Sequence, residues 1–294
     1  MKTIHSLVVR NLKIYFRDRA LVLYSLISVF IIIGLYALFL GNVMADGISK
    51  AVNTGVNVRP VVDSWIMSGL VLVNAVNVPL MMLDTMVVDR WSGRLRDFVA
   101  SPMKRSHLTA SYLVASWVIG MILELLTIAL AEVYIAANGG SLLSPLKLLE
   151  AVLAAALCVA TYSAVFFFVT LFFKSPNAFS ALCTVVGTLI GFIGGIYIPI
   201  GSLPDYMQHV MKLIPVTHSA ALLREIFVSA PLDEVFKGAP ASAESAVARQ
   251  FGIQLSYGGK IMPDVWLVLI TLFTGIAFYI LSIIAAAHSG KKEL

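Results

Sequence analysis

The sequence predicts an all-α membrane protein with six transmembrane helices, an N-terminal amphipathic interfacial helix and short re-entrant helices after the fifth span. Of its 294 residues, 59% are hydrophobic and only 13% are charged, whereas a soluble domain carries about 25% charged residues. Apolar stretches that can cross a bilayer, which takes about 20 residues, recur along the chain. These stretches do not alternate as membrane strands do, and lipid requires internally satisfied backbone, so helices are expected.

The first element is expected over residues 1–19 as an amphipathic helix. With 3.6 residues per turn, its basic and apolar side chains separate onto opposite faces. Such a helix before the first span is expected to lie flat among the inner lipid headgroups, so membrane lipids are predicted partners. The alternative is a positive patch beside the membrane with no defined shape. One face would hold Lys2, Ser6, Arg10, Lys13 and Arg17, and the other Ile4, Leu7, Val8, Leu12 and Tyr15.

The transmembrane domain is expected over residues 20–290. The third span holds two acids, Glu124 and Glu132, in otherwise apolar surroundings. Residues 201–263 form the largest segment between spans. Its first half, 205–227, is predicted to form short re-entrant helices, and 229–259, rich in Ala, Ser and Gly, is predicted to be an exposed loop. The six spans are predicted at about 20–43, 63–88, 107–137, 145–173, 176–200 and 264–288.

The distribution of Lys and Arg predicts the orientation. One side of the predicted topology collects 13 of the 21 basic residues and is therefore expected to be cytoplasmic. Six spans then place both termini in the cytoplasm and the chain in the cytoplasmic membrane. The basic residues of this side are Lys2, Arg10, Lys13, Arg17, Arg19, Arg90, Arg94, Arg96, Lys104, Arg105, Lys174, Lys291 and Lys292.

No catalytic pattern is visible. The sequence has neither a G-x-x-x-x-G-K-[ST] nucleotide-binding loop nor an H-E-x-x-H zinc motif, and its five histidines are scattered. The two cysteines, Cys158 and Cys183, lie in apolar runs and are expected to be small buried residues. We therefore expect no catalytic residue, no metal site, no cofactor bound by this chain and no nucleic-acid partner.

A dense charged segment, residues 89–105, joins the second and third spans on the basic side. Its charged and aromatic side chains could dock a partner protein, or could form an ordinary solvated, positively charged loop. The candidate docking residues are Asp89, Arg90, Gly93, Arg94, Leu95, Asp97, Phe98, Ser101 and Pro102.

The order of residues in this segment resembles the coupling segment of ABC type-2 transporter permeases: an acid and an Arg at the end of span two, then Gly, Leu, a second acid and Ser-Pro. The basic N-terminal helix is similar to the elbow helix of that family. The stretches 194–199, 203–204, 214–218 and 223–227 are similar to the end of its fifth span. The resemblance covers essentially the whole chain.

The resemblance implies that the coupling segment fits a groove of a separate ATPase subunit. It therefore predicts two ATPase subunits that carry the ATP and Mg²⁺, and a second permease chain, expected to form a homodimer. The segment also departs from the family pattern Glu-Arg-Glu-x-Gly-Thr. Here Asp89, Arg90, Trp91, Gly93 and Arg94 stand in its place, without the second acid and the Thr, so single contacts do not transfer.

Within the spans, Gly187, Gly191 and Gly195 recur every four residues, and such a face lets two helices approach closely. We expect this face to form the subunit interface, as the resemblance also implies; packing within one subunit is the alternative. Glu124 is costly in hydrocarbon, by about 2.5 kcal/mol or more. It is a candidate for substrate contact or gating, or else forms a buried hydrogen bond.

These features predict the permease subunit of an ABC exporter. Its pathway, lined by spans one, two and five, is rich in aromatic and aliphatic residues, which favours a hydrophobic or amphipathic substrate such as a drug, an antibiotic or a lipid-like molecule. Glycan export is a weaker option. The 201–263 segment, which the predicted topology places on the external side, is too small to capture an imported substrate. The rival functions are an ion-gradient-driven secondary transporter using Glu124 and Glu132, and a membrane anchor that recruits a soluble partner.

Overall fold

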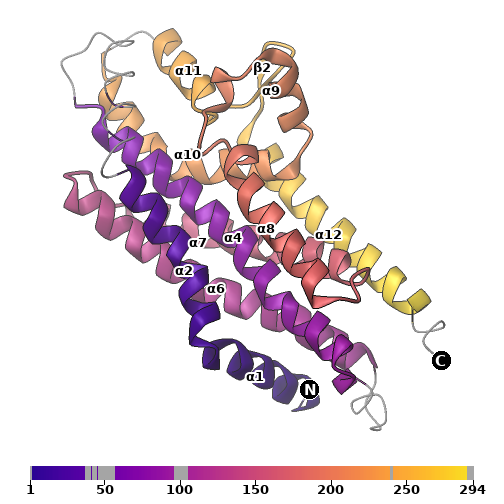
Figure 1. The fold of residues 1–294 in the computed structure, drawn as a ribbon. Helices are drawn as coiled ribbons and strands as arrows, with labels where there is room; N and C mark the ends of the chain where they lie inside the picture. The colour runs from indigo at the N-terminus through magenta and orange to yellow at the C-terminus, as the bar shows by residue number, and fades with distance from the viewer. Residues whose placement is uncertain are drawn as a thin grey trace.

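The computed structural model describes residues 2–36, 41, 45, 57–95, 105–238 and 241–289, and confirms the all-α fold (Figure 1). Five of the described helices are individually long and apolar enough to cross a membrane. Two further pairs of helices, each bent at a short break, raise the number to at most seven. The chain is therefore a multipass membrane protein.

The N-terminal pair consists of α1 (Lys2–Arg17) and α2 (Arg19–Leu35). Asp18 separates them: its side chain accepts a hydrogen bond from Leu21 N at 3.0 Å and so caps α2. The two helices meet at 74°. Because of this bend, α1 lies across the end of the bundle while α2 runs along it (Figure 1).

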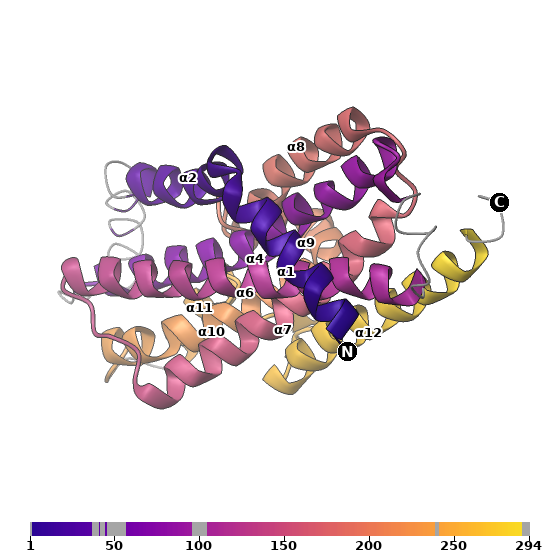
Figure 2. The ribbon, with the colours of Figure 1, turned by 90° about the horizontal axis from the view of Figure 1, so that it is seen from below.

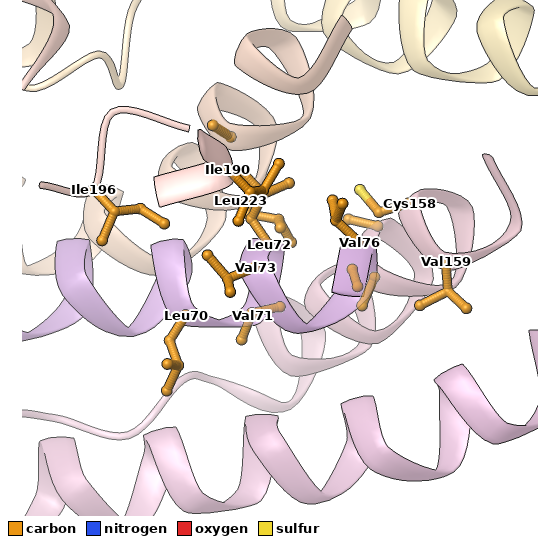
Figure 3. Packing of buried hydrophobic residues seen from close by; sticks show 14 of the residues in the cluster. Leu70, Val71, Leu72, Val73, Val76, Cys158, Val159, Ile190, Ile196 and Leu223 are labelled. Carbon is orange, nitrogen blue, oxygen red and sulfur yellow. The ribbon is translucent and has the colours of Figure 1, made fainter. Parts of the chain in front are cut away.

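The central helix is α4 (Arg59–Trp91), which is buried on nearly all sides. A helix that is apolar all round is expected to lie inside a bundle. Around α4 pack α6 (Arg105–Ala137), α7 (Pro145–Thr170) and α8 (Pro176–Ile193). Figure 3 shows side chains of α4 from Leu70 to Val76 pointing outward in several directions, with residues of α7, α8 and later segments around them.

Helices α2 and α8 flank α4 on one side of the bundle, whereas α7 and the last helix, α12 (Asp264–Ser289), lie on the other side (Figures 1 and 2). The first residue of α1 and the last residue of α12 lie at the same end (Figure 1). We call this the basic end, because Arg10, Lys13, Arg17, Arg90 and Lys174 are there. We call the opposite end the capped end, because the short elements between α8 and α12 cover it.

Helix α8 ends at Ile193, earlier than residue 200, where the sequence predicts the span to end. Gly195 has φ +66°, a conformation that glycine adopts without steric cost. Gly195 N donates to Phe192 O at 2.9 Å and Ile196 N donates to Gly191 O at 2.8 Å. This pair of bonds is the Schellman closure, and it turns the chain away from the helix axis.

The capped end holds a group of short elements between α8 and α12. The helix pair α9–α10 is bent by 91° at the break before Pro215. The prediction of an exposed loop over 229–259 is wrong, because α10 continues to Val235 and α11 follows; Ala is the best helix former, so the Ala-rich composition favours this outcome. The elements are η2 (Ile200–Ser202), α9 (Asp205–Lys212), α10 (Pro215–Val235), α11 (Ala241–Gln250), β1 (Ser256–Tyr257) and β2 (Lys260–Ile261).

Arg224 of α10 holds the capped end together. Its Nη2 donates to the carbonyl oxygens of Gly194 and Gly195 at 2.6 and 2.9 Å. Its guanidinium carbon lies 5.0 Å from the ring centre of Trp65, and the indole Nε1 donates to Phe251 O at 2.7 Å. The carbonyl end of a helix carries partial negative charge and so stabilises the buried cation. This contact fixes α8, α10, α4 and the end of α11 against one another.

Gly195→Ala is expected to destabilise the protein by about 1–2 kcal/mol, the cost of placing a side chain in the left-handed conformation. Thermal unfolding of the purified protein in detergent measures the effect. Gly34→Ala is the matched control: a Cβ at Gly34, within α2, meets nothing within 4 Å. It is expected to be neutral or to stabilise by about 0.5–1 kcal/mol. Equal melting temperatures for the two variants would contradict this account of the turn.

Candidate functional site

The basic end is organised around Asp89, near the end of α4, whose side chain is 0% exposed. Arg10 of α1 binds it with both terminal nitrogens: Nη1 lies 2.7 Å from Oδ2 and Nη2 lies 3.0 Å from Oδ1. A paired arrangement of this kind matches the planar guanidinium to the planar carboxylate and is stronger than a single bond. It ties the amphipathic helix to the end of the central helix.

Two further donors complete the Asp89 site. Tyr112 of α6 donates from its hydroxyl to Oδ2 at 2.6 Å. Arg94, whose side chain is 58% exposed, donates to Oδ1 at 3.3 Å. Burial by itself would lower the pKa of Arg10, but the hydrogen bond and negative charge of Asp89 raise that pKa above its ordinary value. The carboxylate therefore joins α1, α4 and α6 in one charged network, which we call the Asp89 junction.

Arg90, the next residue, connects α4 to a fourth helix. Its Nη1 donates to the carbonyl oxygens of Leu171 and Phe173 at 3.2 and 3.0 Å, and more weakly to that of Thr170 at 3.4 Å. These carbonyls follow the end of α7, where a helix leaves acceptors without partners and carries partial negative charge. Adjacent residues of opposite charge thus anchor the end of α4 in different directions.

Beyond these anchors the chain becomes accessible. Trp91 is 69% exposed, and Gly93 turns the chain with φ +78°. Leu95 packs partly against the buried cluster. Four predicted docking residues, namely Asp97, Phe98, Ser101 and Pro102, lie outside the described residues. The Asp89 junction therefore fixes where the 89–105 segment begins.

The sequence grouped Asp89 and Arg90 as surface residues that contact a partner, whereas the structure gives both internal partners. Arg10 and Tyr112 were not predicted as members of this site. The position of Arg10 on the basic face of α1 could have indicated a role in this site. No sequence pattern could have indicated Tyr112, because its distance to Asp89 depends on how α4 and α6 pack. Trp91, an exposed aromatic beside the junction, is the residue of this region best placed to meet another protein.

The three glycines predicted for a subunit interface have different surroundings. A Cβ at Gly191 would collide with the Tyr197 ring, so this position is covered from within the chain. Gly195 closes α8 beside Arg224. Only at Gly187 is the space above the helix open, with nothing within 4 Å among the described atoms. Ser180 and Thr184, seven and three residues earlier and therefore on the same face of α8, are exposed.

Glu124 lies inside the bundle, 0% exposed, and neither carboxyl oxygen has a hydrogen-bond partner within the described part of the chain. Asn74 of α4 is the side chain next to it, and the Asn74 amide donates to Thr127 Oγ1 at 2.7 Å. Glu132 is separate: it accepts from Leu143 N at 2.9 Å and so holds the connection between α6 and α7. The two acids do not share a site.

Among the residues that the structure describes, no three His, Cys, Asp or Glu side chains are grouped to hold a metal ion. The arrangement at the basic end provides mechanical connections between helices and an exposed surface.

The fold thus defines a multipass membrane protein. Comparison with protein families identifies the class: the sequence matches the ABC-2 type transporter family over residues 2–228. The chain belongs to this family, as its sequence motifs predict, and family membership implies association with ATP-binding subunits. A search of curated proteins found no matching relative.

Asp89→Asn is expected to destabilise the protein by about 1.5–3 kcal/mol, because it removes the charge that strengthens the hydrogen bonds from Arg10 and Tyr112. The control is Glu150→Gln. Glu150 forms an exposed pair with Lys147 at 2.9 Å, and its loss is expected to change stability by no more than about 0.5 kcal/mol. Thermal unfolding in detergent measures both.

The double variant Arg10→Gln/Asp89→Asn is expected to cost less than the sum of the two single changes, because the residues are directly bonded. Additive effects would show that the contact between α1 and α4 does not depend on this ion pair.

Proposed function

We propose that this chain is the membrane permease subunit of an ABC exporter and that two separate cytoplasmic ATPase subunits drive it. The observation that carries the proposal is the Asp89 junction. It joins the amphipathic helix α1, the central helix α4 and α6 at the start of the 89–105 segment. The excess of Lys and Arg there supports a cytoplasmic orientation of this end.

In this proposal the 89–105 segment receives the motion of the ATPase. Asp89 and Arg90 are positioning residues that hold the segment to four helices, and Trp91 and the residues after Gly93 make the contact. ATP and Mg²⁺ bind to the ATPase subunits, because this sequence has no phosphate-binding loop. When the ATPases close, the force reaches α4 through its anchored end, and α4 moves as one packed unit.

A second copy of this chain completes the transporter. The exposed side of α8 around Gly187 and the exposed apolar side of α2 are the proposed contact surface, since both helices lie on the same side of the bundle (Figure 2). Apolar and small residues on this side suit helix packing in lipid. The pathway runs between the two copies, lined by α2, α4 and α8.

The proposed cargo is a hydrophobic or amphipathic molecule, such as a drug, an antibiotic or a lipid-like compound, and the proposed direction is outward. Large exposed side chains of α2 and α8, among them Phe30, Ile31 and Phe192, support an apolar cargo. The rival, an ion-driven transporter that uses Glu124 and Glu132, needs both acids on one accessible path. Glu124 is enclosed and Glu132 is bonded into a loop, which favours the exporter.

Purification of the tagged permease in mild detergent is expected to recover an ATPase. Trp91→Ala is expected to reduce its recovery or its substrate-stimulated hydrolysis about tenfold or more, because central aromatic contacts carry much of the binding energy at interfaces. The control is Trp266→Ala: Trp266 is 52% exposed on the first turn of α12, at the capped end. If no ATPase accompanies the wild-type chain, or if transport requires a proton gradient and no ATP, the proposal fails.

Gly187→Cys, in a Cys183→Ala background, is expected to form dimers with a short thiol cross-linker in native membranes, because the proposed interface brings the two α8 helices together. Leu153→Cys is the control: Leu153 is 60% exposed on α7, which lies on the opposite side. Denaturing gels measure the product. Cross-linking through position 153 and none through 187 would place the interface elsewhere.

A further inference from the structure

One face of the central helix is partly exposed, although the rest of the helix between residues 61 and 89 is buried. Every residue of α4 from 61 to 89 is buried except five. At 100° per residue, these five fall within an arc of about 100°, so they form a single stripe. Helices α2 and α8 flank α4, the helix that carries this stripe (Figures 1 and 2). Its members are Asn77, Met81, Asp84, Thr85 and Val88.

Asp84 is the charged member of this stripe, which we call the α4 stripe. Its Oδ1 is buried without a hydrogen-bond partner, and in the described part of the chain its side chain forms no ion pair. Cys183 of α8 lies near it and brings no positive charge. Seven residues separate Asp84 from the end of α4, so it lies about 10 Å from the basic end.

The other two acids of α4 each have a paired cation, which Asp84 lacks in the described part of the chain. Asp63, at the capped end, is paired with Arg59 at 2.9 Å. Asp89 is paired with Arg10 at 2.7 Å. Carboxylates inside a membrane protein are costly and are normally compensated by a cation or face an aqueous pathway. Asp84 is therefore the one acid of α4 that has no cation beside it in the described part of the chain.

The uncharged neighbours of Asp84 on the stripe are apolar. Met81 lies three residues before it and Val88 four residues after it, so both lie beside it on the same helix face. A bound inorganic ion would need several oxygen ligands, whereas this stripe offers one carboxylate, one amide and one hydroxyl. A cation with a large apolar body matches both the charge of Asp84 and its apolar neighbours.

We propose that the α4 stripe is the substrate-binding surface and that Asp84 selects an organic cation with an apolar body. The inference deepens the proposed exporter and rests on it, since it assigns the chemical class of the cargo. The position of Asp84 toward the basic end suits loading from the cytoplasmic side. Glu124, enclosed within the bundle, does not contact the cargo.

The test uses two probes of the same shape and opposite charge, tetraphenylphosphonium and tetraphenylborate. Equilibrium dialysis against the purified full-length permease measures their binding, with detergent micelles alone as the blank for partitioning. Stimulation of ATP hydrolysis is measured in parallel on the complex. The wild-type protein is expected to bind the phosphonium saturably and to bind the borate at least about tenfold more weakly.

Asp84→Asn is expected to weaken phosphonium binding about tenfold or more, which corresponds to about 1.4 kcal/mol, and to remove the preference over borate. Asp84→Glu keeps the charge and is expected to keep the preference. Glu150→Gln removes an exposed carboxylate of α7 and is expected to leave binding unchanged. If Asp84→Asn does not fold, Met81→Lys gives a second test: one turn away on the stripe, its ammonium is expected to pair with Asp84 and displace the probe.

Equal binding of the two probes by the wild type, or unchanged phosphonium binding by Asp84→Asn or Met81→Lys, would overturn the inference. The proposed function fails in a different way. If no ATPase is recovered but the dialysis result holds, the chain binds organic cations without being an ABC subunit. If the ATPase is recovered and coupled but charge selection is absent, the inference of an organic-cation cargo fails and the proposed exporter stands.

Discussion

The buried carboxylate of Asp89 is the constraint on which the basic end depends. A charge without water must have its oxygens satisfied by donors, and here those donors come from α1, from α6 and from the chain just beyond α4. Three segments far apart in sequence therefore meet at one point. Arg90 extends the connection to α7, so that the segment between the second and third spans begins from a fixed base.

Helix α4 connects this base to the other end of the molecule. Trp65, near its start, lies under Arg224 and bonds to Phe251, and Asp89 is 24 residues later, about 36 Å along the helix. Between these points nearly every side chain is packed. Closely packed interiors shift between discrete arrangements more readily than they deform continuously, so a displacement at one end of α4 is expected to reach the other.

The charged side chains inside the protein have different surroundings. Asp89 has cations, and Arg224 has the carbonyl end of α8. Glu124 is enclosed beside an amide, without a partner for either oxygen in the described chain. Among the described acids of α4, Asp84 combines the absence of an ion pair with a partly exposed helix face. Each arrangement has a different consequence: rigidity at the two ends of α4, a buried polar centre in α6, and a surface that can accept a ligand.

The sequence by itself determined the fold class, the N-terminal helix and the family, because long apolar runs and basic periodicity are local properties that lipid converts directly into helices. It did not determine the helical parts of 229–259, namely the end of α10 and α11, because a composition rich in Ala, Ser and Gly also fits a loop. Only the tertiary structure separated Gly187 from Gly191 and Gly195, paired Arg10 and Tyr112 with Asp89, and left Asp84 open. Contacts between helices depend on their rotation and register, and in a chain apolar on every face the sequence pattern does not specify which face turns inward.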